Sequence, residues 1–136
     1  MAQSIKLGND TYLDASGVAV NNSGGTLADI NYKVLSYTSQ YVNTSVSSLD
    51  AYKYGRIVIL YVNLGVQNNF PLNTEVPVAT INSEYLPYKK SNFTLAEQGG
   101  PGVLLQVYSN GSITLYLTSG STRNFIRGTI AYISAS

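Results

Sequence analysis

The chain has 136 residues, a formal net charge of +1 and 11% charged residues, whereas about a quarter of the residues of an average soluble protein are charged. Its length suits one domain that buries a hydrophobic core of its own. It contains no histidine and no cysteine, which excludes Ser-His-Asp and Cys-His catalysis, disulfide bonds, and most zinc and iron sites.

Partners and location are constrained by the same composition. No cluster of Lys and Arg forms a basic stripe, so nucleic acid is not an expected partner. No apolar run is long enough to cross a membrane, and the opening MAQSIKLGND lacks the apolar core of a signal peptide. We therefore expect a protein made in a cytoplasm, with no membrane insertion, no cofactor and no metal.

Residues 1–26 differ from the rest of the chain. Short apolar pairs alternate there with turn residues such as Gly8-Asn9-Asp10 and Ser16-Gly17. Strands of two or three residues cannot bury a core alone and need partners. We expect residues 1–26 to form a stalk or shoulder, with a linker near residues 21–26, and residues 27–136 to form the head domain.

The next segment, residues 27–48, fits neither the helical nor the strand period cleanly. Its enrichment in Tyr, Thr and other β-branched residues favours strand. The run Arg56–Leu64 is the strongest predicted strand, and both of its faces are apolar. Either a loop covers the second face, or that face, with Ile57, Ile59 and Tyr61, is a subunit interface of a homotrimer.

The remaining predicted strands are short and lie between Gly, Asn, Ser and Pro residues. Asn110-Gly111 connects two of them and predicts a type I′ hairpin. The pattern indicates an all-β protein, an antiparallel sandwich or barrel. The strands are predicted at Val76–Ile81, Val103–Tyr108, Ser112–Leu117 and Phe125–Ile133.

The carboxylates do not indicate an enzyme. Asp10 and Asp14 are close in the sequence, but a glycosidase needs two carboxylates facing each other across a cleft, and no local motif shows such a pair. We expect them to be turn residues and predict no catalytic residue. The Gly-rich stretch Glu97–Val103 lacks the P-loop pattern, and is either a mobile connection or a tip loop that shapes a receptor pocket.

The chain has twelve Tyr and no Trp, which directs attention to tyrosine as a contact residue. Tyr side chains near Pro or Gly, next to cations and amides, are typical of sites that stack on sugars. The alternative for each Tyr is a half-buried position in a strand. The predicted ligand-binding residues are Tyr52, Tyr54, Tyr85, Tyr88, Lys89 and Asn92.

Four stretches of the second half share a loose family pattern. They are AYKYGRIVILYVNL (Ala51–Leu64), SEYLPYKKSNFTL (Ser83–Leu95), VYSNGSITLYL (Val107–Leu117) and GTIAYIS (Gly128–Ser134). Together they resemble the C-terminal head domain of phage tail-fibre and receptor-binding proteins. The opening SIKLGNDTYLDASGV is similar to short phage segments that precede such heads.

The resemblance implies a jelly-roll-like β-sandwich head, a homotrimer, and binding to a bacterial surface glycan or other envelope component. It also implies a virion location, with other virion proteins contacted through the N-terminal segment. Two other functions stay open. One is a capsid head-fibre or decoration protein without a receptor of its own, and the other is a depolymerase of surface polysaccharide.

Overall fold

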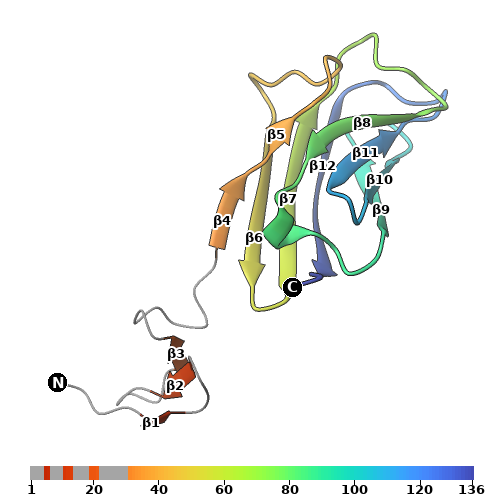
Figure 1. The fold of residues 1–136 in the computed structure, drawn as a ribbon. Helices are drawn as coiled ribbons and strands as arrows, with labels where there is room; N and C mark the ends of the chain where they lie inside the picture. Colours follow the sequence, from red (N-terminus) through yellow and green to blue (C-terminus); the bar gives the residue numbers. More distant parts are fainter. Residues whose placement is uncertain (1–4, 7–10, 14–18, 22–30) are drawn as a thin grey trace.

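The computed structural model describes residues 5–6, 11–13, 19–21 and 31–136. The first three of these ranges are β1 (Ile5–Lys6), β2 (Thr11–Leu13) and β3 (Ala19–Asn21), which pair as a small antiparallel sheet (Figure 1). The predicted linker, apart from Asn21, and the predicted boundary between residues 26 and 27 lie outside the described residues. The division into stalk and head therefore stays a prediction.

The other strands form one antiparallel sheet in the order β4-β6-β7-β12-β9-β10-β11-β8-β5 (Figure 1). This confirms the prediction of an all-β, antiparallel protein. A single 3-10 turn, η1 (Ser83–Tyr85), interrupts the strands in this part of the chain. The strands are β4 (Asn31–Val34), β5 (Ser36–Tyr37), β6 (Ser48–Tyr54), β7 (Ile57–Gly65), β8 (Glu75–Thr80), β9 (Ser91–Glu97), β10 (Val103–Val107), β11 (Ser112–Tyr116) and β12 (Phe125–Ile133).

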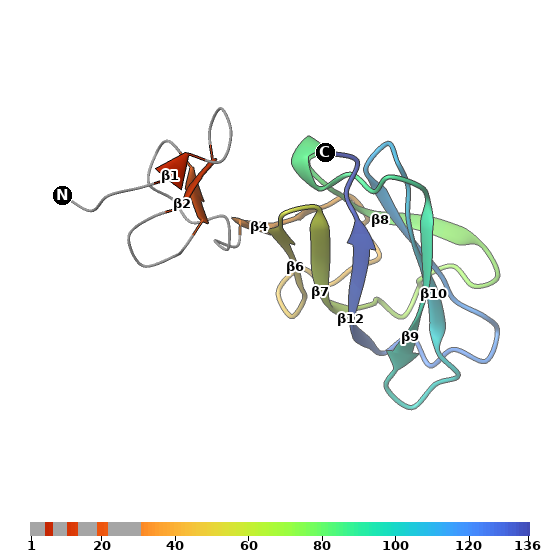
Figure 2. The same cartoon turned by 90° about the horizontal axis from the view of Figure 1, so that it is seen from below.

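The sheet curls because its two edge strands are consecutive in the chain. Only Leu35 separates β4, which pairs with β6, from β5, which pairs with β8. The side chain of Leu35 is buried, and its N–H donates to the carbonyl of Leu49 (2.9 Å). A strand that bends and changes partners in this way makes the corner of a curled sheet. Figure 2 shows the result, with β6, β7 and β12 facing β9 and β10 across the interior.

The hydrophobic core fills the space inside the curl. Strand alternation turns every second side chain of β7 inward, where Val58, Leu60 and Leu64 have no exposed surface. The facing half contributes Leu105 and Leu115 to the same core. Burial of each such side chain contributes about 1.5–3 kcal/mol relative to an exposed position.

The predicted strands agree with the structure to within about two residues where alternation is clear, as in β7, β8, β10, β11 and β12. The strand preference for residues 27–48 is confirmed only in part, because turns follow β5. The alternation of apolar and polar residues in the sequence did not predict where β6 and β9 begin and end. Only alternate residues of these strands, such as Leu49 and Leu95, are core residues, and polar side chains separate them.

The Asn110-Gly111 hairpin forms, but its turn type was predicted wrongly. Gly111 has a φ of +95°, whereas Asn110 is not in the left-handed region, so the two positive φ values of a type I′ turn are absent. The N–H of Gly111 donates to the carbonyl of Tyr108 (3.0 Å), and the N–H of Tyr108 donates to the carbonyl of Ser112 (2.9 Å). These bonds define a three-residue loop that ends in a left-handed glycine, a hairpin class usually built on a type I turn.

We expect Gly111→Val to destabilise the head by on the order of 1–3 kcal/mol. A β-branched residue is strained at this φ, and a Cβ there would lie 2.9 Å from the carbonyl oxygen of Ile81. Urea unfolding of the purified variant measures the loss. Gly55→Val is the comparison that carries the backbone strain alone, because Gly55 also has a positive φ (+57°) but a Cβ there meets no atom within 4 Å. Equal stability of Gly111→Val and wild type would contradict the proposed turn.

Candidate functional site

One outer surface of the sheet is apolar. It is formed by outward side chains of β6, β7 and β12, which strand pairing places side by side: Tyr54 opposite Ile57, Ile57 opposite Ile133, and Ile59 opposite Ala131. Ile57, Ile59 and Tyr61 are 45%, 36% and 58% exposed. We call this surface the apolar face, and its residues are Tyr52, Tyr54, Ile57, Ile59, Tyr61, Ala131 and Ile133.

Among the described residues, the expectation that both faces of β7 are covered is thus met on one side only. The described residues do not include a loop of the same chain that buries the apolar face. Soluble monomers rarely expose a large contiguous apolar surface, and such surfaces mark sites of interaction. The prediction that Ile57, Ile59 and Tyr61 form a subunit interface is compatible with this exposure and stays a prediction.

Two predicted ligand-binding residues belong to this same surface. Tyr52 and Tyr54 follow strand alternation on the outer side of β6, where they lie opposite Ile59 and Ile57. Tyr54 is exposed and Tyr52 is half-buried. The structure therefore places these two tyrosines beside the predicted interface residues.

Tyr85 is a core residue, so the expectation that it is exposed is wrong. Only 2% of its surface is accessible, and the hydroxyl of the buried Tyr132 donates to its carbonyl oxygen (2.6 Å). Burial, with a smaller contribution from Glu84, raises the pKa of Tyr85, and burial raises the pKa of Tyr132. The chain turns inward at η1 just before Leu86-Pro87, which a loop assignment from the sequence does not show.

The other three predicted residues lie together along a groove of about 390 Å³ between β9 and β12. Tyr88 is 63% exposed, and Lys89 lies with its ammonium 5.6 Å from the centre of the Tyr88 ring. Asn92 projects outward from β9. The groove is lined by Tyr88, Lys89, Ser91, Asn92, Phe93, Ala131, Tyr132 and Ile133, and it therefore adjoins the apolar face.

The groove exists because β9 and β12 diverge. They pair only at Ile126–Glu97 and Arg127–Ala96, and beyond this point the side chain of Leu95 packs against Gly128. A Cβ at Gly128 would lie 2.7 Å from Leu95 Cδ2, so a larger residue does not fit without movement. Gly128 and Tyr132 thus have structural roles at the groove. Gly128 leaves room for the side chain of Leu95, and the hydroxyl of Tyr132 donates to the carbonyl of Tyr85.

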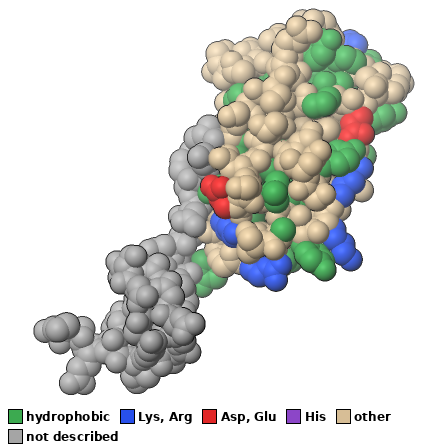
Figure 3. Space-filling view, in the orientation of Figure 1, with side chains coloured by type: hydrophobic (Ala, Val, Ile, Leu, Met, Phe, Trp, Pro, Cys, Tyr) green, Lys and Arg blue, Asp and Glu red, His purple; other side chains and the backbone are tan. Residues whose placement is uncertain are grey.

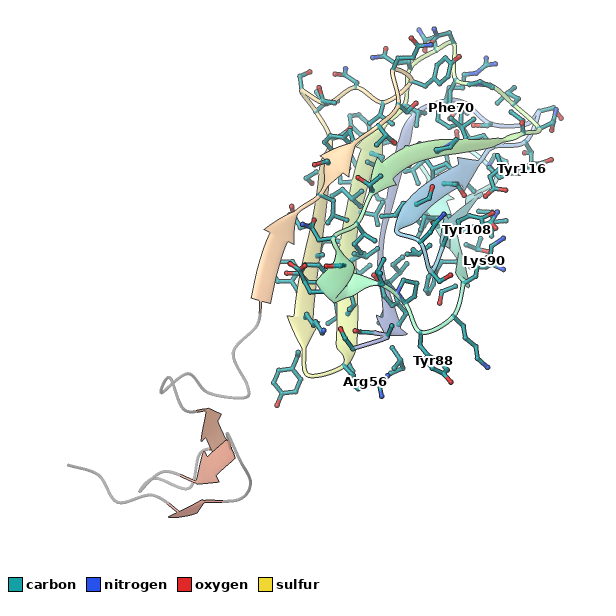
Figure 4. All side chains as sticks on the ribbon, viewed as in Figure 1. Arg56, Phe70, Tyr88, Lys90, Tyr108 and Tyr116 are labelled. Atoms are coloured by element: carbon teal, nitrogen blue, oxygen red, sulfur yellow. The ribbon has the colours of Figure 1, made fainter. Side chains whose placement is uncertain are left out.

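The loops at the end of the sheet opposite the β6–β7 turn form a second candidate region. We call residues 66–74, 98–102 and 118–124 the tip loops; Phe70 marks them in Figure 4. Asn73 and Arg123 both have positive φ, and Arg123 Nε donates to the carbonyl of Phe70 (2.9 Å). Strained backbone of this kind often marks functional loops.

Glu97 anchors the predicted Gly-rich loop to these tip loops. Its buried carboxylate accepts hydrogen bonds from the hydroxyls of Ser121 (2.5 Å) and Thr122 (3.1 Å). Its second oxygen, Oε2, has no partner among the described residues and packs against Gly100. The contact leaves no room for a side chain at Gly100, where a Cβ would lie 2.1 Å from Oε2.

The surface of the head is largely uncharged. In the view of Figure 3 most of it consists of polar side chains and backbone, with Lys and Arg side chains gathered mainly towards the lower end. Within the described residues, no group of three or more His, Cys, Asp or Glu is placed to hold a metal ion. No helix in the described part of the chain has the length and apolarity to span a membrane. No protein-family model matches the chain, and no curated protein matches its sequence.

Proposed function

We propose that the chain is the head of a phage or prophage fibre, a homotrimer that binds a glycan or other component of the bacterial envelope. The observation that carries the proposal is the apolar face, which lies on an otherwise polar and weakly charged head. A second copy of the chain is the occupant we assign to it. The sequence resemblance to phage fibre heads supports the same assignment.

In this proposal the curled sheet serves as a jelly-roll-like β-sandwich head, and three heads meet around an axis through their apolar faces. The N-terminal segment contacts other virion proteins, and the location is the virion. The groove with Tyr88, Lys89 and Asn92 adjoins the apolar face, so it lies at the border between subunits. Three weak sites held on one fibre bind a cell surface far more tightly than one site, because avidity multiplies the affinity.

The experiment that tests the proposed function is binding of fluorescently labelled protein to panels of Gram-positive and Gram-negative cells. We expect binding to one host group, and a loss of binding in Tyr88→Ala and Asn92→Ala with unchanged melting temperature. Gln40→Ala is the matched control, because Gln40 is an exposed amide outside both the groove and the tip loops. If both groove variants bind as wild type does, the receptor site lies elsewhere, with the Glu97–Gly102 loop next to be tested.

Two further assays separate the other functions. Protein that binds phage capsids but no cell would instead be a capsid-decoration protein. Release of new reducing ends from purified surface polysaccharide would identify a depolymerase. Neither result is expected from a fibre head that only binds its receptor.

A further inference from the structure

A small pocket lies on the outer side of the other half of the sheet, over β8, β11 and the β10–β11 hairpin. Its volume is about 230 Å³. Pockets that hold drug-sized ligands are larger, about 300–1,000 Å³, so this one suits a single small ring. It is lined by Glu75, Pro77, Tyr108, Asn110, Ser112 and Thr114, and none of them is among the predicted ligand-binding residues.

The side chains of the pocket are held in place by one another. The hydroxyls of Tyr108 and Thr114 both donate to Glu75 Oε1, the latter at 2.7 Å. Lys90 donates to the Tyr108 hydroxyl (3.0 Å) and lies 4.2 Å from the centre of its ring. Figure 4 shows Tyr108 and Lys90 together on this side of the head. Thr114 is only 4% exposed although it is on the outer face, because the network covers it.

Several groups of the pocket have no hydrogen-bond partner among the described residues. The first is the acceptor Oε2 of Glu75, because the hydroxyls of Tyr108 and Thr114 both donate to Oε1. The side-chain N–H₂ of Asn110 is a donor, because its oxygen accepts from the Ser112 N–H (3.0 Å). The Ser112 hydroxyl can act as both. The rings of Pro77 and Tyr108 add apolar surface between these groups.

The charges of the site balance. The Glu75 carboxylate and the Lys90 ammonium are linked through the Tyr108 hydroxyl, so an additional cation or anion gains little there. A ligand with several hydroxyls on an apolar ring matches both the polar groups and the ring surfaces. We propose that this pocket binds one ring of a neutral, hydroxyl-rich sugar, with a sugar hydroxyl donating to Glu75 Oε2.

The ionisation of Glu75 supports this geometry. The hydrogen bonds from Tyr108 and Thr114, and to a lesser degree the charge of Lys90, hold the pKa of Glu75 below its ordinary value. The carboxylate acceptor is therefore present throughout neutral pH and is lost only at a pH below the ordinary pKa of Glu. We expect sugar binding to be constant between about pH 5 and pH 8 and to weaken in more acid solution.

The proposal deepens the proposed function and rests on it only for the physiological source of the sugar. The experiment is an NMR titration of the full chain with millimolar methyl glucoside, methyl galactoside and N-acetylglucosamine as probes, with glucuronate and glucosamine as charged comparisons. We expect at least one neutral sugar to shift the signals of Asn110 and Ser112. Glu75→Gln should weaken that binding about tenfold or more, because a hydrogen bond to a charged acceptor is lost.

Glu84→Gln is the matched control, since Glu84 is an exposed carboxylate on η1 outside the pocket, and it should bind sugar as wild type does. Tyr108→Phe, which removes a donor to Glu75, should also weaken binding. The proposal is overturned if no neutral sugar shifts these signals, or if Glu75→Gln binds as tightly as Glu84→Gln. If the pocket binds no sugar but the protein still binds cells, only the sugar proposal is contradicted. If the pocket binds sugar but the protein binds no cells, only the proposed function is contradicted.

Discussion

Ile59→Lys is expected to convert a trimer of the protein into monomers that stay folded. Ile59 is at the centre of the apolar face and is 36% exposed in the single chain, so a lysine there reaches solvent in the monomer. In the trimer the same ammonium would be buried without a partner, at a cost of about 3–5 kcal/mol for each subunit. Light scattering coupled to size-exclusion chromatography measures the mass, and circular dichroism measures the fold.

The matched control is Thr80→Lys, because Thr80 is exposed on β8, which pairs with β11 and β5 and with no strand of the apolar face. It should stay trimeric. A monodisperse wild-type monomer at micromolar concentration would contradict the trimer, and so would an Ile59→Lys variant with the mass of wild type. An Ile59→Lys variant that unfolds would show that folding depends on assembly.

Tyr85→Ala is expected to destabilise the protein strongly and Tyr88→Ala hardly at all, although the two residues are only three positions apart. Tyr85 is buried, so its truncation should leave a cavity and cost about 3–5 kcal/mol, as for other large aromatic residues in cores. The melting temperature of Tyr85→Ala should fall by on the order of 10 °C relative to wild type. Tyr88 is exposed, and Tyr88→Ala should change stability by about 0.5 kcal/mol or less.

Thermal unfolding of the two variants beside wild type makes this comparison directly. Tyr132→Phe is a useful third variant, because it removes only the hydroxyl that donates to the carbonyl of Tyr85. We expect it to cost about 1 kcal/mol, since one buried hydrogen bond is lost and the ring remains. A Tyr85→Ala protein as stable as Tyr88→Ala would show that the Tyr85 ring does not pack in the core.

Predictions from the sequence succeeded where the signal is local. Alternation in Ser112–Tyr116 and Phe125–Ile133 directs every second side chain to the core, and that pattern is visible without knowledge of any partner strand. The left-handed conformation at Gly111 was also predictable from the local sequence, whereas the turn type was predicted wrongly. The doubly apolar β7 correctly indicated a surface with apolar side chains on its outer side.

Only the tertiary structure decided which residues share a surface. Tyr52 and Tyr54 join the apolar face through their register with β7, and Tyr85 enters the core because the chain turns inward at η1.

The sequence by itself determined that the chain forms an antiparallel all-β sheet, because backbone period and turn chemistry are written in neighbouring residues. It could not show that Leu35 joins the two edges of that sheet, or that Glu75, Lys90 and Tyr108 meet in one pocket. Those three side chains come from separate parts of the chain. Their contact depends on the pairing and curl of strands, which no local pattern specifies.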